Sequence, residues 1–175
     1  MGTSQLEQMV VGLTEEVRGR FYGKYRGLVD DADDPEHMGR VRARVPSVYG
    51  DVVSPWALPA APFAGESYGF LFVPKEDAGV WIEFEGGDPS LPIWSGCWWA
   101  SNELPSPGGP TQRVLTTPNG LSVVMDDDAR ELKLVHPGGA EVALTDDGIT
   151  LSFGSASIAL TSSGVSVNDG ALEVR

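Results

Sequence analysis

The chain has 175 residues, a length that suits one ordinary domain or two small ones. Its hydrophobic fraction of 41% is enough for a core, and 22 glycines with 13 prolines favour short strands and turns over long helices. A formal net charge of −13 excludes the basic surface that nucleic acids or anionic membranes require. The single cysteine, Cys97, excludes an internal disulfide, and its apolar neighbours predict a buried, unreactive thiol.

The first residues show no targeting signal. No apolar run approaches the roughly 20 residues of a membrane-spanning helix, and no basic segment is followed by an apolar one. We therefore expect assembly in the cytoplasm and no stable insertion into a membrane.

Residues 1–23 contain a predicted amphipathic helix that begins near Thr3 and ends before Gly23. Its apolar residues follow the three- and four-residue spacing of one helical face: Leu6, Met9, Val10, Leu13 and Val17. Two interpretations stay open. Either the helix packs on its own domain, or it docks on a partner protein.

Residues 24–100 predict a small closed β-barrel of OB type. The clearest strand is residues 40–45, in which Val41, Ala43 and Val45 alternate with three arginines, as expected for a half-buried strand. Glycine, proline or aspartate separates it from the other predicted strands, which are residues 25–29, 56–59, 69–73 and 80–84. Closely spaced prolines and glycines then predict a linker over residues 101–119.

Residues 120–175 contain an internal repeat. Residues 140–151 match residues 156–167 at an offset of 16, with alanine, leucine, threonine and glycine identical in place. Each strand supplies only two or three apolar side chains, too few for one chain to enclose a core. Three chains around one axis would solve this, so the segment predicts a trimeric, intertwined β-helical needle with strands bonded across the chains. The alternative is an ordinary β-sandwich with accidental similarity between strands.

The predicted trimer core consists of the apolar positions of the repeat: Val142, Leu144, Ile149, Leu151, Ile158, Leu160, Val165 and Val167.

Several segments of residues 24–100 resemble, in order and spacing, the motifs of phage baseplate assembly protein V and of the type VI secretion spike. They are Gly39–Pro46 (GRVRARVP), Ser54–Ala57 (SPWA), Gly69–Pro74 (GFLFVP), Gly79–Phe84 (GVWIEF) and Glu85–Gly96 (EGGDPSLPIWSG). The resemblance implies an OB-like barrel, a trimeric β-helical needle after it, and a place at the centre of a baseplate. It also implies a hub protein and a small PAAR-type tip protein as partners.

The sequence departs from some members of that family. The linker is too short for the lysozyme domain that some carry between barrel and needle. The only histidines, His37 and His136, lie far from the C-terminus, so the iron-binding H-x-H tip of other members is not expected. Only a short segment precedes the barrel, so the hub is expected to be a separate protein.

We expect no enzymatic activity, no cofactor and no metal site. Two histidines and one cysteine are a poor supply of catalytic groups, and the aspartate clusters at residues 30–34 and 126–128 lack EF-hand spacing and predict solvated turns. Trp81, between Val80 and Ile82, is predicted to lie in the core. The other tryptophans leave one alternative function, a carbohydrate-binding or adhesin-type β module.

The predicted function is that of a structural spike in a phage-tail-like contractile injection system, which joins the hub to the tip and leads membrane penetration. The predicted hub contacts are Leu6, Met9, Val10 and Leu13. Apolar alternation continues to the end of the sequence, and an uncapped last layer would expose apolar side chains and unpaired backbone groups. The predicted contacts to the tip protein are therefore Leu172, Val174 and Arg175.

Overall fold

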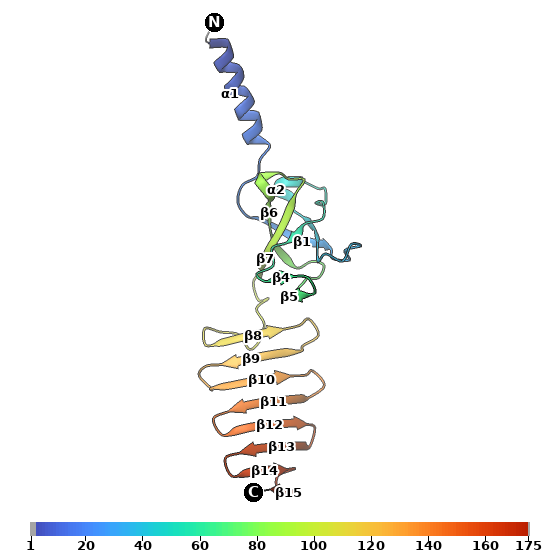
Figure 1. Ribbon diagram of the computed structural model, residues 1–175, viewed down its shortest axis with the longest axis vertical. Coiled ribbons are helices and arrows are strands. Elements are labelled where there is room, and N and C mark those ends of the chain that lie inside the picture. The colour runs from blue at the N-terminus through green and yellow to red at the C-terminus, as the bar shows by residue number, and fades with distance from the viewer. Residues whose placement is uncertain (1–2, 175) are drawn as a thin grey trace. The chain divides into compact units, whose positions relative to one another are not determined.

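The computed structural model describes residues 3–174 and consists mostly of β-strands (Figure 1). The chain forms two compact units that divide between Asn102 and Glu103. Each unit has a large sheet of its own, so the mainly β fold class predicted from the sequence is confirmed.

The N-terminal unit begins with helix α1 (Thr3–Arg18), which lies in the segment predicted to be helical. The other elements are β1 (Tyr25–Asp31), β2 (Arg42–Arg44), α2 (Pro46–Tyr49), β3 (Leu58–Pro59), β4 (Ala64–Gly65), β5 (Tyr68–Gly69), β6 (Gly79–Phe84), the 3-10 turn η1 (Glu85–Gly87) and β7 (Pro92–Trp98). Five strands form the main sheet in the order β2-β1-β6-β7-β3. Its neighbouring strands are antiparallel except β3 and β7, which run parallel.

Strict alternation places the core of this unit on one side of the sheet. In β6, Val80, Ile82 and Phe84 are buried, whereas the residues between them are partly exposed. Val41, Ala43 and Val45 are fully buried, in agreement with the alternation of residues 40–45. The two strands with the clearest sequence pattern therefore provide most of the core.

An aromatic cluster packs at the edge of this core. The ring of Phe84 lies 5.9 Å from Phe21, 5.6 Å from Tyr25 and 6.0 Å from Tyr49, measured between centroids. The Tyr49 hydroxyl donates a hydrogen bond of 2.6 Å to the carbonyl of Pro89, which ties α2 to the turn before β7. Burial raises the pKa of Tyr49 to about 12.

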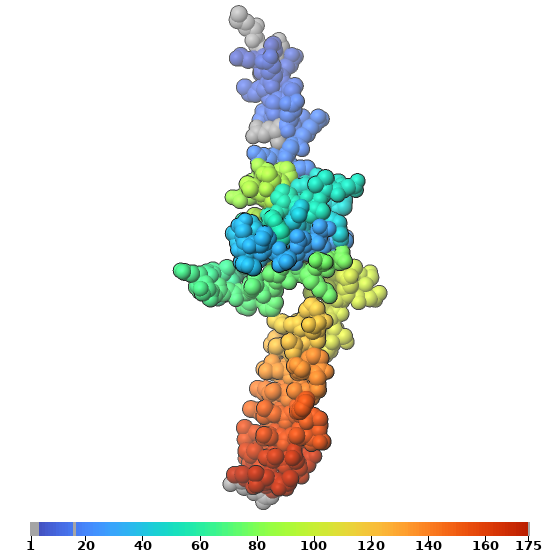
Figure 2. Space-filling model, turned by 90° about the vertical axis from the view of Figure 1, so that its right-hand side faces the viewer, coloured from blue at the N-terminus to red at the C-terminus, as the bar shows by residue number. Residues whose placement is uncertain are grey.

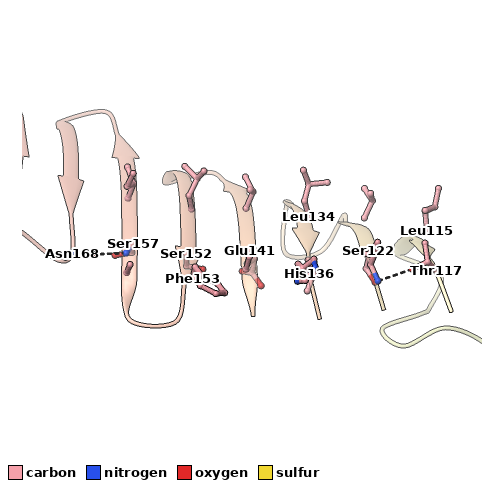
Figure 3. Close-up of a pocket in the computed structure, with 18 of the residues that line it drawn as sticks. Leu115, Thr117, Ser122, Leu134, His136, Glu141, Ser152, Phe153, Ser157 and Asn168 are labelled. Atoms are coloured by element: carbon pink, nitrogen blue, oxygen red, sulfur yellow. Dashed lines mark hydrogen bonds between the residues drawn. The ribbon is translucent and has the colours of Figure 1, made fainter. Parts of the chain in front are cut away.

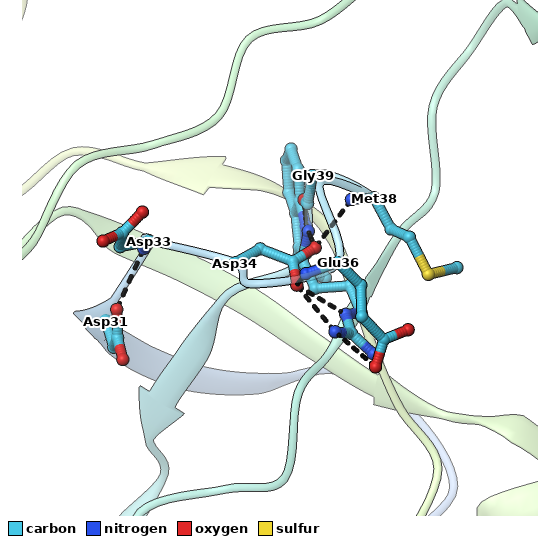
Figure 4. Close-up of polar contacts among 8 residues, drawn as sticks. Asp31, Asp33, Asp34, Glu36, Met38 and Gly39 are labelled. Carbon is cyan, nitrogen blue, oxygen red and sulfur yellow. Dashed lines mark hydrogen bonds and ion pairs between the residues drawn. The ribbon is translucent and has the colours of Figure 1, made fainter.

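One buried carboxylate organises the acidic segment after β1 (Figure 4). Asp34 is 6% exposed and accepts hydrogen bonds from the backbone N–H groups of Glu36, Met38 and Arg40. The guanidinium of Arg40 donates two more, at 3.0 and 2.6 Å. These Arg40 hydrogen bonds are the main reason why the pKa of Asp34 lies well below its usual range. The predicted solvated turn is therefore wrong for Asp34.

The segment between β3 and β6 differs from the strand predicted at residues 69–73. Only a short hairpin forms, in which β4 pairs with β5, and residues 70–73 lie outside any strand. Its aromatic rings pack against one another: Phe63 is tilted against Tyr68 and meets Phe70 edge-on, and Phe70 stacks on Phe72. All four side chains are more than half exposed, and this green segment projects from the body of its unit (Figure 2).

The C-terminal unit is one antiparallel sheet of eight strands whose order in the sheet is their order in the chain. The strands are β8 (Gln112–Thr116), β9 (Ser122–Asp126), β10 (Glu131–Val135), β11 (Ala140–Thr145), β12 (Gly148–Phe153), β13 (Ala156–Thr161), β14 (Gly164–Val167) and β15 (Leu172–Val174). Strand β8 lies inside the segment predicted to be a linker, so that prediction is wrong for these residues. They form a strand that pairs with β9 along its whole length. We refer to these eight strands as the ladder sheet.

The repeat of 16 residues corresponds to two successive strands and their turns. Its identical glycines, Gly148 and Gly164, open β12 and β14 with φ values of 147° and 141°. A Cβ atom on Gly148 would lie 2.0 Å from the carbonyl oxygen of Leu160 on the neighbouring strand. Glycine is required at this position because both the backbone angle and the close approach exclude a side chain.

Every inner strand of the ladder sheet is paired on both sides within its own chain. Strand β11, for example, pairs with β10 on one side and β12 on the other. This pairing does not support the prediction that main-chain hydrogen bonds run between chains. Association of such sheets depends instead on their side chains.

Candidate functional site

The ladder sheet carries one continuous apolar face. Its register aligns the apolar side chains into two rows that cross the sheet. The first row is Leu115, Val123, Leu134, Val142, Leu151, Ile158, Val167 and Leu172, and the second is Met125, Leu132, Leu144, Ile149, Leu160, Val165 and Val174. We call these fifteen side chains the apolar face.

The apolar face has no cover within the described residues. Leu134, Leu151 and Leu160 are each 46% exposed, although they lie in the middle of a sheet. A groove follows the first row, and Phe153 lines its margin with an exposed fraction of 64% (Figure 3). Contiguous exposed apolar surface of this kind marks an interaction site rather than a solvated surface.

The opposite face of the ladder sheet is polar in its C-terminal half. Its central row contains Thr150, Ala159, Ser166 and Glu173, which pair across β12 to β15. Toward the N-terminal strands, Lys133 forms an ion pair of 3.0 Å with Glu131, and this hydrogen bond raises the pKa of Lys133. On either side of Lys133 the same row includes Val124 and Ala143, which are buried at 9% exposed, so the two faces differ mainly in their C-terminal halves.

The structure brings all the predicted trimer-core residues together. Val142, Leu151, Ile158 and Val167 lie in the first row, and Leu144, Ile149, Leu160 and Val165 lie in the second. Their common face agrees with the sequence prediction, and their contact with other chains stays a prediction.

The predicted tip contacts occupy the last strand of the same sheet. Leu172 and Val174 extend the two rows into β15, the edge strand, and both are 59% exposed. Arg175 lies outside the described residues. The end of the ladder sheet is therefore as apolar as its middle.

Sequence reasoning missed the N-terminal third of the apolar face. Leu115, Val123, Met125, Leu132 and Leu134 continue the two rows through β8, β9 and β10. These strands precede the repeat and match it only loosely. Their two-residue alternation, in Leu132 and Leu134 for example, was the available signal.

The predicted hub contacts lie on α1. Leu6, Met9, Val10 and Leu13 are each more than half exposed, and they do not pack on the barrel. This exposure favours the interpretation in which the helix serves a partner. The hub contact itself stays a prediction.

Two predictions about the barrel surface are wrong. Trp81 lies opposite the core, where the guanidinium of Arg26 stacks 5.5 Å from its ring centroid and 5.3 Å from that of Trp98. Cys97 is exposed rather than buried. The position of Trp81 follows from strand alternation, because it points away from the buried Val80 and Ile82 of the same strand. Alternation does not account for the exposure of Cys97, which pairs with Val80 next to an irregularity in the register. Trp99 is also exposed, at 63%.

The described residues show no arrangement suited to catalysis by a metal. Among the described side chains, no group of three or more histidines, cysteines, aspartates or glutamates is placed to hold a metal ion. No described helix is both long and apolar enough to cross a membrane.

Comparison with known families gives two matches, one to each unit. Residues 25–99 match the type VI secretion system/phage-baseplate injector OB domain. Residues 112–173 match the phage baseplate V C-terminal trimerisation domain, a range that includes β8 and nearly all of the apolar face. A search of curated proteins found no match. Because the two domains follow one another and together span the barrel and the ladder sheet, the chain belongs to the phage baseplate V family of baseplate and spike proteins.

Proposed function

We propose that this protein is the central spike of a contractile injection system, a structural homotrimer that joins a baseplate hub to a tip protein. The observation that carries the proposal is the uncovered apolar face of the ladder sheet. It coincides with the trimerisation domain of the family. Three copies related by rotation would bring three such faces together around one axis and remove them from water.

The way each sheet is bonded supports the proposed mechanical role. Inner strands of the ladder sheet have partners on both edges within their own chain, so a single strand cannot leave without breaking two rows of hydrogen bonds. Apolar packing between three sheets would add resistance to bending. Such a shaft suits a part that transmits axial force and leads membrane penetration when a sheath contracts.

The two ends of the spike would bind different partners. At the C-terminal end, Leu172 and Val174 leave the edge strand apolar and exposed, which suits capping by a PAAR-type tip protein. At the other end, we propose that α1 is the element that meets the hub. No enzymatic step belongs to this role, and assembly would take place in the cytoplasm before the spike becomes part of a tail-like particle.

The exposed aromatic segment around β4 and β5 favours one alternative. Phe63, Tyr68, Phe70 and Phe72 present an exposed aromatic surface of the kind that sugars contact. The alternative is a carbohydrate-binding or adhesin-type module, and a glycan array would detect it.

The experiment that tests the proposed function is native mass spectrometry of the full chain, followed by immuno-electron microscopy of injection particles from the producing cell. We expect a mass of three chains and labelling confined to the baseplate. A monomer, or a trimer that is absent from the particle, would contradict the spike assignment. Saturable glycan binding by such a free protein would support the alternative.

A further inference from the structure

Helix α1 carries apolar surface that the ladder sheet does not explain. Leu6, Val10, Leu13 and Val17 are between 54% and 67% exposed. The segment that follows the helix is held to the barrel, since the Phe21 N–H donates to the Gly87 carbonyl at 2.8 Å. Arg20 adds a hydrogen bond of 3.3 Å to the Gly86 carbonyl. The helix is therefore attached at its base, while its apolar side chains have no described partner.

This helix is a weak one in isolation. It has 16 residues, and its interior contains Gly12 together with the β-branched Val10 and Val11. Helices of this length are marginal in water, and glycine costs about 1 kcal/mol relative to alanine. A stable α1 therefore requires packing against another surface.

The apolar residues of α1 follow a heptad pattern. Leu6 and Leu13 occupy d positions, and Val10 and Val17 occupy a positions, so that the spacing is four, three and four. Met9 falls at the neighbouring g position and widens the stripe. The opposite side carries Gln5, Gln8, Gly12 and Glu15. This is the pattern of helices that pack on copies of themselves in register.

We propose that the three α1 helices of one trimer pack together as a parallel coiled coil, with Leu6, Val10, Leu13 and Val17 inside. The trimerisation domain holds three copies of the chain in one trimer. The three α1 helices are then tethered to one another, so their association no longer depends on the concentration of free chains. A threefold axis relates the copies, so helices that meet around it run parallel and in the same register.

The flanking positions are compatible with this arrangement. Valine at a with leucine at d favours a coiled coil of two helices when no other part of the chain sets the number, but here the trimerisation domain imposes three helices. The apolar Met9 makes the stripe wider than a two-stranded seam needs. In a parallel bundle, Met9 at g meets Thr14 at e of the next helix, which is an uncharged pair.

The coiled coil changes the expected hub contact. The stripe of α1 is used between the three chains, and the outward residues Gln8, Val11 and Glu15 remain for the hub. The inference itself rests on the trimer, and only this last consequence rests on the proposed function.

The test uses the full chain without any other protein, in a Cys97→Ser background with a nitroxide label at Gln8→Cys. We expect a narrow distribution of distances between labels, centred below about 30 Å, because packed helix axes lie about 8–10 Å apart. Native mass spectrometry of the same sample reports the trimer separately. A monomer would contradict both the spike and the coiled coil, whereas a trimer with broad, long distances would overturn the coiled coil alone.

Two adjacent valines provide matched variants. Val10 and Val11 are 54% and 56% exposed in one chain, so Val10→Asp and Val11→Asp are equivalent unless the helices meet. We expect Val10→Asp to abolish the short distance and Val11→Asp to keep it, with the trimer mass unchanged in both. Equal behaviour of the two variants would overturn the proposal.

Discussion

The substitution Leu160→Asp tests the apolar face most directly. Leu160 lies in the second row, between Ile149 and Val165, and is 46% exposed in one chain. Covering the remaining half of a leucine side chain stabilises by about 1 kcal/mol per chain. Burial of the introduced carboxyl at pH 7 requires its protonation, which costs about 4 kcal/mol because pH 7 lies roughly three units above its usual pKa. For three chains the total is about 15 kcal/mol, as large as the net stability of most domains.

We therefore expect Leu160→Asp to lose the trimer at pH 7. Native mass spectrometry or sedimentation would measure this loss, with Ser157→Asp as the control on the opposite face of the same strand. The introduced carboxyl would have a raised pKa in the trimer, so its penalty appears as the pH rises above about 4 and the trimer recovers as the pH falls. A Leu160→Asp trimer that persists at pH 7, or equal loss in the two variants, would refute the inside–outside assignment of the sheet.

Four further outcomes are expected. Truncation after Gly109 removes β8 to β15 and should leave a folded monomeric barrel by light scattering; a tight trimer would move the assembly contact into the barrel. Deletion of residues 171–175 should abolish binding of a co-expressed PAAR-type protein and leave the trimer mass intact, and retained binding would place that contact elsewhere. Asp34→Asn should lower the melting temperature of the barrel at neutral pH. Since the pKa of Asp34 is depressed by Arg40, its contribution is present above about pH 4 and fades as the pH falls further, so the difference between the proteins should shrink in acid. Single-stranded DNA should show no binding at about 150 mM salt, because few cations offset the acidic charge, and submicromolar affinity would contradict this.

The sequence was most informative where the apolar residues followed one regular spacing. Alternation over residues 40–45 predicted the buried positions Val41, Ala43 and Val45, and the 16-residue repeat predicted a common face for Val142 and Leu160. These predictions succeeded because a strand directs alternate residues to opposite sides whatever its environment.

The sequence-based predictions that were wrong failed for local reasons. Residues 70–73 are apolar without alternation, a pattern that does not specify pairing, and the segment stays outside the sheet. The prolines and glycines around β8 predicted a linker, but residues 112–116 form a strand because they pair with β9. Burial of Asp34 depends on Arg40 and on three backbone N–H groups, and composition gives no sign of such convergence.

The local pairing of the ladder sheet has a consequence for how the particle is built. Each strand bonds to the strands next to it in the chain, so contact order in this unit is low and each sheet can form without waiting for distant residues. Trimer formation is then a docking of preformed surfaces, and its rate depends on the concentration of chains. Until two further copies arrive, the newly made sheet exposes a surface that also invites incorrect partners. Synthesis of several chains from one messenger RNA would shorten that interval, since neighbouring ribosomes deliver copies close together.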